Sequence, residues 1–349
     1  MTARLNVDAR KAKHVNIGFN INKIYCSVIN PKTGIVEQHF KANSFVDAYL
    51  KHHAVITGAA SSYSIPLITT GSAIMQSPCN RLEPGSGDAN GILVSSDDTP
   101  IAITDAVLAD RWTSNEVSYG TITATPVQVS LTESYIDIER TITALQDNVE
   151  IKSIALAGRN STVGWMLARD ILPAPITLNN TDARVFRYRI YLEGFLKNWN
   201  VRMHSGFSGS DQLAVSTTGS TLNTRQNISD SMNASSGNAL YGIIIGSGLT
   251  AVDYEDYNLE SPHTTDDFTF GSSSAHIETD LVANVGWVQL QRTFTNISGV
   301  DKTVSEVGLI YTNSSDDLLF LIHRHVLAVP VVVADAEPFV VTYRFIIES

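Results

Sequence analysis

The sequence repeats itself at a nearly constant spacing over most of its length. The stretch GILVSSDDTPIAITDAVL at 91–108 corresponds to GIIIGSGLTAVDYEDYNL at 242–259, an offset of 151 residues (91 to 242). The offset grows from 146 residues (49 to 195) to 155 residues (188 to 343), and the order of the matches is kept. A tandem duplication with small loop insertions produces this pattern. We therefore predict two related domains, at 49–194 and 195–349, behind an N-terminal extension at 1–48.

Within each copy, apolar residues alternate with polar ones. One strand face is shared by Ile136, Ile138, Arg140 and Ile142 in the first copy, and by Val288, Leu290, Arg292 and Phe294 in the second. A second shared face is predicted for Trp165, Leu167 and Arg169, matched by Phe320, Ile322 and Arg324. A period of two is that of a strand with one buried face. No long helical period appears, so the sequence predicts an all-β chain. It would form two tandem antiparallel β-sandwich domains, jelly-roll or Ig-like, with one short helix at Ser44–Lys51.

Length and charge narrow the classes of protein that fit. With 349 residues, each predicted domain can bury a core without disulfides or metal. The net charge of −11 disfavours a phosphate-neutralising surface, so we expect no direct nucleic-acid binding. No apolar run reaches the roughly 18 residues of a membrane span, and residues 1–25 lack the apolar core of a signal peptide. We therefore expect a protein made in the cytoplasm without membrane contact. Cys26 and Cys79 are expected to be buried apolar residues.

Two segments invite more than one interpretation. The start of the chain is basic, with Arg4, Arg10, Lys11 and Lys13. Residues 1–14 are predicted to be a solvated tail, or an arm that lies on an acidic neighbouring subunit. Val15–Asn30 and Ile35–Phe40 then alternate as strands do, around the turn PKTG. Ser205–Asn238, rich in Ser, Gly, Thr and Asn, is predicted to form mobile loops or a segment ordered against neighbours.

Two arginines recur on apolar strand faces in both copies. They are Arg140 with Arg292, and Arg169 with Arg324. A buried arginine needs a carboxylate or several carbonyl oxygens, because an unpaired charge is too costly to bury. Asp105 and Asp256 also recur and are the expected partners. We interpret these arginines as structural, the alternative being a contact between subunits.

Other polar residues have spacings that metal or catalytic sites use. His323 and His325 lie two apart on one strand, a spacing that can hold zinc or copper, but an outward polar face is favoured. The pairs Asp97–Asp98 and Asp266–Asp267 offer calcium ligands without EF-hand spacing and are better explained as acidic loops. There is no G-x-S-x-G motif, and Gly246–Gly248 lacks the context of a phosphate-binding loop. We assign no catalytic, metal or cofactor residues and expect no cofactor.

The second copy contains a distinctive series of short motifs. They are Gly246–Thr250 (GSGLT), Arg292–Asn296 (RTFTN), Ser305–Leu309 (SEVGL), Arg324–Val331 and Val341–Tyr343. In this order they resemble a pattern found in structural proteins of tailed bacteriophages. In that family an IGTGTT-like turn is followed by RTFTN, SEVGL, LxRxVLxxPV and closing VTY strands. The resemblance covers 195–349 well, 49–194 weakly and 1–48 not at all. It implies a β-sandwich in a virion.

This resemblance implies a non-enzymatic structural component of the head, neck or tail. Its partners would be copies of itself and other virion proteins, with no small-molecule substrate, and its location the virion, assembled in the host cytoplasm. The alternative is a glycan- or host-binding module of a tail fibre or surface adhesin. That alternative predicts exposed aromatic residues, the candidates being Trp112, Tyr119, Trp199, Tyr254 and Tyr257, whereas Trp165 and Phe320 are expected in the core. A β-sandwich hydrolase is the third hypothesis, and no site motif favours it.

Overall fold

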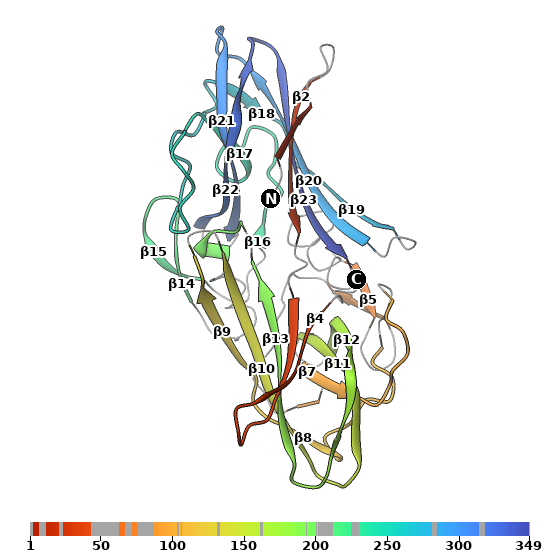
Figure 1. Ribbon diagram of the computed structural model, residues 1–349. Coiled ribbons are helices and arrows are strands. Elements are labelled where there is room, and N and C mark those ends of the chain that lie inside the picture. The colour runs from red at the N-terminus through yellow and green to blue at the C-terminus, as the bar shows by residue number, and fades with distance from the viewer. Residues whose placement is uncertain are drawn as a thin grey trace.

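The chain is an all-β protein whose strands form two pairs of stacked sheets (Figure 1). The computed structural model describes residues 3–6, 12–20, 24–42, 63–66, 72–75, 87–88, 90–102, 105, 107–130, 133–160, 163–192, 194–199, 201, 212–224, 230–280, 285–313 and 318–348. The all-β fold class is confirmed. The predicted helix at Ser44–Lys51 and the side chain of Cys79 lie outside the described residues.

The first half contains two antiparallel sheets. One has the order β4-β3-β13-β10-β8, with β9 also paired to β10, and the other has the order β12-β11-β7. Their strands are β3 (Ile24–Ile29), β4 (Val36–Ala42), β7 (Gly91–Ser95), β8 (Val117–Tyr119), β9 (Thr123–Gln128), β10 (Ser134–Ala144), β11 (Val149–Asn160), β12 (Val163–Leu178) and β13 (Ala183–Tyr191). Each inward face is apolar, as the alternation in β10 predicts.

The second half repeats this arrangement. One sheet has the order β1-β2-β23-β20-β18 with β19 on β20, and the other is β16-β21-β17 with β22 on β21. Their strands are β1 (Ala3–Asn6), β2 (Lys13–Asn20), β16 (Asp230–Ser231), β17 (Gly242–Gly246), β18 (Phe268–Phe270), β19 (Ser274–Asp280), β20 (Val285–Asn296), β21 (Lys302–Asn313), β22 (Leu318–Val333) and β23 (Pro338–Glu348).

Strand pairing in the two halves agrees in detail. Strand β10 pairs with β8, β9 and β13, and β20 pairs with β18, β19 and β23. A register shift between Leu156 and Ala157 in β11 has its counterpart between Leu309 and Ile310 in β21. The two positions match at the offset of 153 residues (156 to 309) seen in the sequence. This agreement is what the predicted domain duplication leads one to expect.

The N-terminal extension adds one hairpin to each half. Strands β3 and β4 extend the first half, because β3 pairs antiparallel with β13. Strands β1 and β2 extend the second half, because β2 pairs parallel with β23. The expectation of a solvated tail is therefore wrong for the described residues 3–6 and 12–14, whereas an arm that contacts a neighbouring subunit stays a prediction. The physical reason is that the apolar side chains of Val15 and Ile17 are buried against the chain's own second half.

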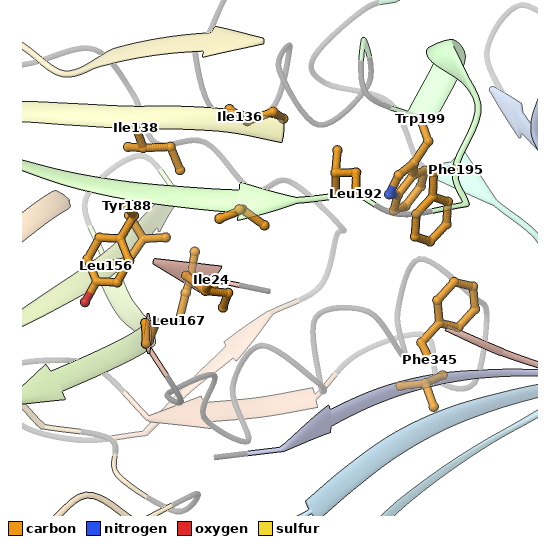
Figure 2. Packing of buried hydrophobic residues seen from close by; sticks show 14 of the residues in the cluster. Ile24, Ile136, Ile138, Leu156, Leu167, Tyr188, Leu192, Phe195, Trp199 and Phe345 are labelled. Atoms are coloured by element: carbon orange, nitrogen blue, oxygen red, sulfur yellow. The ribbon is translucent and has the colours of Figure 1, made fainter. Parts of the chain in front are cut away.

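The two halves share one apolar interior. Phe195 stacks on Trp199 with ring centroids 5.3 Å apart and on Phe345 of β23 at 6.2 Å. These three rings belong to the second half. Figure 2 shows Leu192, which follows the last strand of the first half, beside Trp199 and Phe195, so the halves meet through this side chain as well as through the chain itself.

In the part of the chain that the structure describes, two small hairpins lie outside these four sheets. Strands β14 (Gln212–Val215) and β15 (Thr221–Thr224) form one of them within Ser205–Asn238, a stretch that also contains β16 of the β21 sheet. The prediction of loops alone is therefore wrong for 212–215, 221–224 and 230–231; 205–211 and 225–229 lie outside the described residues. Strands β5 (Tyr63–Pro66) and β6 (Ser72–Met75) form a further hairpin.

Candidate functional site

Arg140 and Arg292 connect the sheets by donating to backbone carbonyl groups. Arg140 donates to the carbonyl oxygens of Gly120 at 2.8 Å, Asn90 at 2.6 Å, Ile92 at 3.1 Å and Gly87 at 2.6 Å. Arg292 donates to those of Gly271 at 2.8 Å, Tyr241 at 3.0 Å, Ile243 at 2.9 Å and Ser235 at 3.3 Å, and also to that of Asn238. Burial lowers the pKa of each guanidinium to about 10, so both are charged at neutral pH. Their predicted structural role is confirmed.

Arg169 is held by two carboxylates of the loop that follows β7. Its Nη2 lies 2.7 Å from Asp97 Oδ2, and its Nη1 lies 2.9 Å from Asp105 Oδ2. The Nη2 group also donates to the Thr99 carbonyl at 3.1 Å. The predicted pairing of Arg169 with Asp105 is therefore confirmed. Asp97, which the sequence offers as a calcium ligand, instead forms an ion pair with Arg169.

Arg324 is the matching arginine of the second half, and its surroundings are more acidic. Its Nη1 donates to Asp256 Oδ2 at 2.9 Å, as the recurrence of Asp256 predicted. Its Nε donates to Glu306 Oε2 at 2.8 Å, and its Nη2 lies 3.5 Å from Glu260 Oε2. Sequence reasoning missed Glu306, which is fully buried. The signal was present, since the charged residue of SEVGL lies within an apolar strand.

Glu306 also orders the loop that follows β17. Its carboxylate accepts hydrogen bonds from the backbone N–H groups of Gly248 at 3.1 Å, Glu260 at 3.2 Å and Ser261 at 2.8 Å. Glu260 in turn accepts from the N–H groups of Leu249 at 2.7 Å and Thr250 at 2.9 Å. These bonds lower the pKa of the Glu260 carboxyl below its usual value. The GSGLT turn of the resemblance is therefore built around two carboxylates and Arg324.

His323 and His325 are arranged differently from the prediction of an outward polar face. His323 is fully buried, with Nδ1 2.9 Å from the hydroxyl oxygen of Tyr343, while His325 is half-buried. Burial lowers the pKa of both imidazoles, strongly so for His323. Within the described residues, no group of three or more His, Cys, Asp or Glu is placed to hold a metal ion. Asp267, from the second acidic pair, binds Lys302 at 2.6 Å.

A β-bulge explains where these side chains point. Leu309 pairs with His323 but Ile310 pairs with Leu321, so β22 carries one extra residue, Ile322. Such a bulge reverses which face the following residues occupy. The predicted shared face therefore holds for Phe320 and Ile322 but is wrong for Arg324. After the bulge Arg324 lies on the opposite face, where it contacts residues of the loop that follows β17. The first half has the same bulge at Leu167, since Leu156 pairs with Ala168 and Ala157 with Met166.

An open cleft of about 540 Å³ lies beside Arg324. The turn between β14 and β15 supplies Thr217 and Thr218 to its lining. The loop between β17 and β18 supplies Thr250, Asp253, Glu255, Asp256, Tyr257, Asn258, Leu259 and Glu260. The lining is therefore mostly polar, and it holds four carboxylates and one guanidinium.

Most of the aromatic residues expected at the surface are buried. Tyr119, Trp199 and Tyr254 are almost inaccessible. Trp112 is half-buried, and its indole N–H donates to the Glu150 carbonyl at 2.8 Å. Tyr257, at the cleft, is 45% exposed. Trp165 and Phe320 lie in the core, as predicted, and Cys26 is buried.

Comparisons with known proteins add no assignment. No protein-family model, no curated protein and no solved structure matches the chain. Among the described residues, no helix has the length and apolar character needed to cross a membrane.

Proposed function

We propose that this chain is a non-enzymatic structural component of a tailed-bacteriophage particle, in its head, neck or tail. It would act through contacts with copies of itself and with other particle proteins. The observation that carries the proposal is where the resembling motifs lie. Arg292, Glu306 and Arg324, the charged residues central to those motifs, all bond within the fold. Because these charged residues serve the fold, the resemblance points to a shared building unit more than to a shared reaction.

Exposed apolar residues in matching turns support this proposal. Leu145, between β10 and β11, is 48% exposed, and its counterpart Ile297, between β20 and β21, is 49% exposed. Val300 in the second turn is also exposed. Apolar side chains at such positions suit contacts between subunits, whose buried centres are poor in charge. Repeated subunits of one kind close into rings or other symmetric assemblies.

The test is the mass and shape of the purified chain, by light scattering and electron microscopy. A closed ring with a defined number of chains is the expected result. The double variant Leu145→Asp/Ile297→Asp should lower the assembled mass while the far-ultraviolet circular dichroism stays unchanged. If the chain is a monomer and also fails to bind phage particles from which it is absent, the proposal is wrong.

A further inference from the structure

We propose that the cleft beside Arg324 binds a neutral, hydroxyl-rich carbohydrate. Its volume of about 540 Å³ lies within the roughly 300–1,000 Å³ of small-molecule sites. This proposal does not depend on the particle assignment, because it concerns a different surface from the exposed turns at Leu145 and Ile297.

The first half provides an internal comparison for this cleft. Thr250 and Asp256 have counterparts in Thr99 and Asp105, and these four residues contact the arginine in both halves. Four further lining residues have apolar counterparts at the same offset: Asp253, Tyr257, Asn258 and Glu260 correspond to Ala102, Ala106, Val107 and Ala109. The remaining polar ones, Glu255, Thr217 and Thr218, correspond to threonines in the first half. The arginine junction therefore exists without Asp253, Tyr257 and Asn258. These side chains give the second half a polar cleft that the fold itself does not need.

Tyr257 gives the cleft an aromatic surface. Its ring lies over Gly219, where a Cβ atom would come within 3.5 Å of a ring carbon. Gly219 has a φ of +80°, so the turn between β14 and β15 fixes a backbone surface without a side chain under the ring. The tyrosine remains 45% exposed. An aromatic ring supported below and open to solvent suits the C–H face of a sugar, and its hydroxyl adds a polar tip.

The carboxylates of the cleft favour hydroxyl groups over a free cation. Three of the four already have a cationic partner from the chain. Arg324 pairs with Asp256 at 2.9 Å and with Glu260 at 3.5 Å, and Lys197 pairs with Glu255 at 2.8 Å. What the cleft offers is a fixed array of hydrogen-bond acceptors, with the hydroxyls of Thr217 and Thr218 and the Asn258 amide as groups that also donate. Sugar hydroxyls donate and accept in turn, whereas an acidic sugar would meet like charge.

The experiment is a glycan array probed with the intact chain, carrying neutral and sialylated oligosaccharides. The neutral oligosaccharide with the strongest signal is then titrated and followed by NMR. Tyr257→Ala should weaken its binding roughly tenfold or more, equivalent to about 1.4 kcal/mol. Asn258→Ala should weaken it as well. The control is Val129→Ala, an exposed apolar residue of the first half that takes part in neither proposal, and it should leave the affinity unchanged.

The melting temperature of each variant shows whether binding is lost because the chain unfolds. The melting temperature of Tyr257→Ala should match that of the parent, because Tyr257 is exposed. The proposal is overturned if the intact chain binds no neutral glycan, or if Tyr257→Ala binds as well as Val129→Ala. Calcium binding that is lost in Asp253→Asn, without any glycan binding, would overturn it too.

Discussion

Glu306 occupies the space that a side chain at Gly248 would need. A Cβ atom at position 248 would lie 2.5 Å from Glu306 Oε1. In the first half, Ser153 stands at the strand position that matches Glu306, and Asp97 stands at the loop position that matches Gly248. There the carboxylate comes from the loop, and the strand carries the small side chain. Arg169 and Arg324 thus each receive a buried carboxylate, supplied by different positions of the repeat. Each arginine needs a buried negative charge beside it, and either the strand position or the loop position can supply that charge.

This exchange predicts the behaviour of Glu306 variants. Glu306→Ser removes the buried partner of Arg324 and leaves loop N–H groups unpaired, so it should lower the free energy of unfolding by about 3–5 kcal/mol. Adding Gly248→Asp should restore part of this loss, because the serine makes room for the new carboxylate. Urea denaturation measures both. Glu278→Gln, at an exposed strand position, is the control and should change little. A double variant whose loss equals or exceeds the sum of the two single losses would refute the exchange.

Arg140 and Arg292 should not tolerate lysine. Each arginine uses several N–H groups on carbonyl oxygens in different directions, and an ammonium group cannot reproduce that fork. Arg292→Lys is expected to cost about 2–4 kcal/mol of unfolding free energy, from carbonyls left unpaired in the interior. Thermal unfolding measures the effect. Arg344→Lys, on the exposed face of β23, should be nearly neutral, and equal effects in the two variants would contradict the argument.

Alternation alone was enough to predict most of the framework. The β20 pattern identified its inward face, and the recurrence of Asp105 and Asp256 identified both arginine partners. The bulge at Ile322 was not predictable in this way, because 320–324 are all buried and so carry no alternation. A second apolar cluster, which includes Leu196, Leu259 and Leu321, covers the outer side of that strand.

The pairing of β2 with β23 could not be predicted from the sequence, for a different reason. It joins the two ends of the chain, and no local pattern in residues 13–20 specifies a partner. The cleft is similar, since its lining meets only after the turn between β14 and β15 and the loop after β17 are folded. Both features depend on contacts between distant segments, whereas alternation reports on a single strand.

Acid should destabilise the fold through His323. Its folded-state pKa lies well below the ordinary 6.5, so above about pH 6.5 the imidazole is neutral in both the folded and the unfolded chain. Below that pH the unfolded chain takes up a proton that the folded chain does not, and stability falls as the pH drops toward the folded-state pKa. One such proton contributes a slope of up to about 1.4 kcal/mol per pH unit.

The measurement is urea denaturation between about pH 7 and pH 5, where His325, whose pKa is also lowered, adds to the slope. His323→Gln should flatten the dependence, since the amide does not titrate. Carboxyl groups with lowered pKa values, such as Glu260 and Glu337, act in a separate window below about pH 4.5. An unchanged slope in the glutamine variant would show that His323 does not control this window.

The first strands of the chain should stabilise its last strand. Ile17 of β2 is 1% exposed and pairs with Tyr343 of β23, while the neighbouring Asn16 is exposed. Ile17→Ala should therefore lower the free energy of unfolding by about 2–5 kcal/mol, the cost of truncating a core side chain, and Asn16→Ala should have almost no effect. Hydrogen exchange of the β23 amides tests the same relationship at the level of the strand. Amides of β23 should exchange faster in Ile17→Ala than in Asn16→Ala, because β2 covers one edge of that strand. Equal protection in the two variants would mean that β2 is not the element that holds β23 in place.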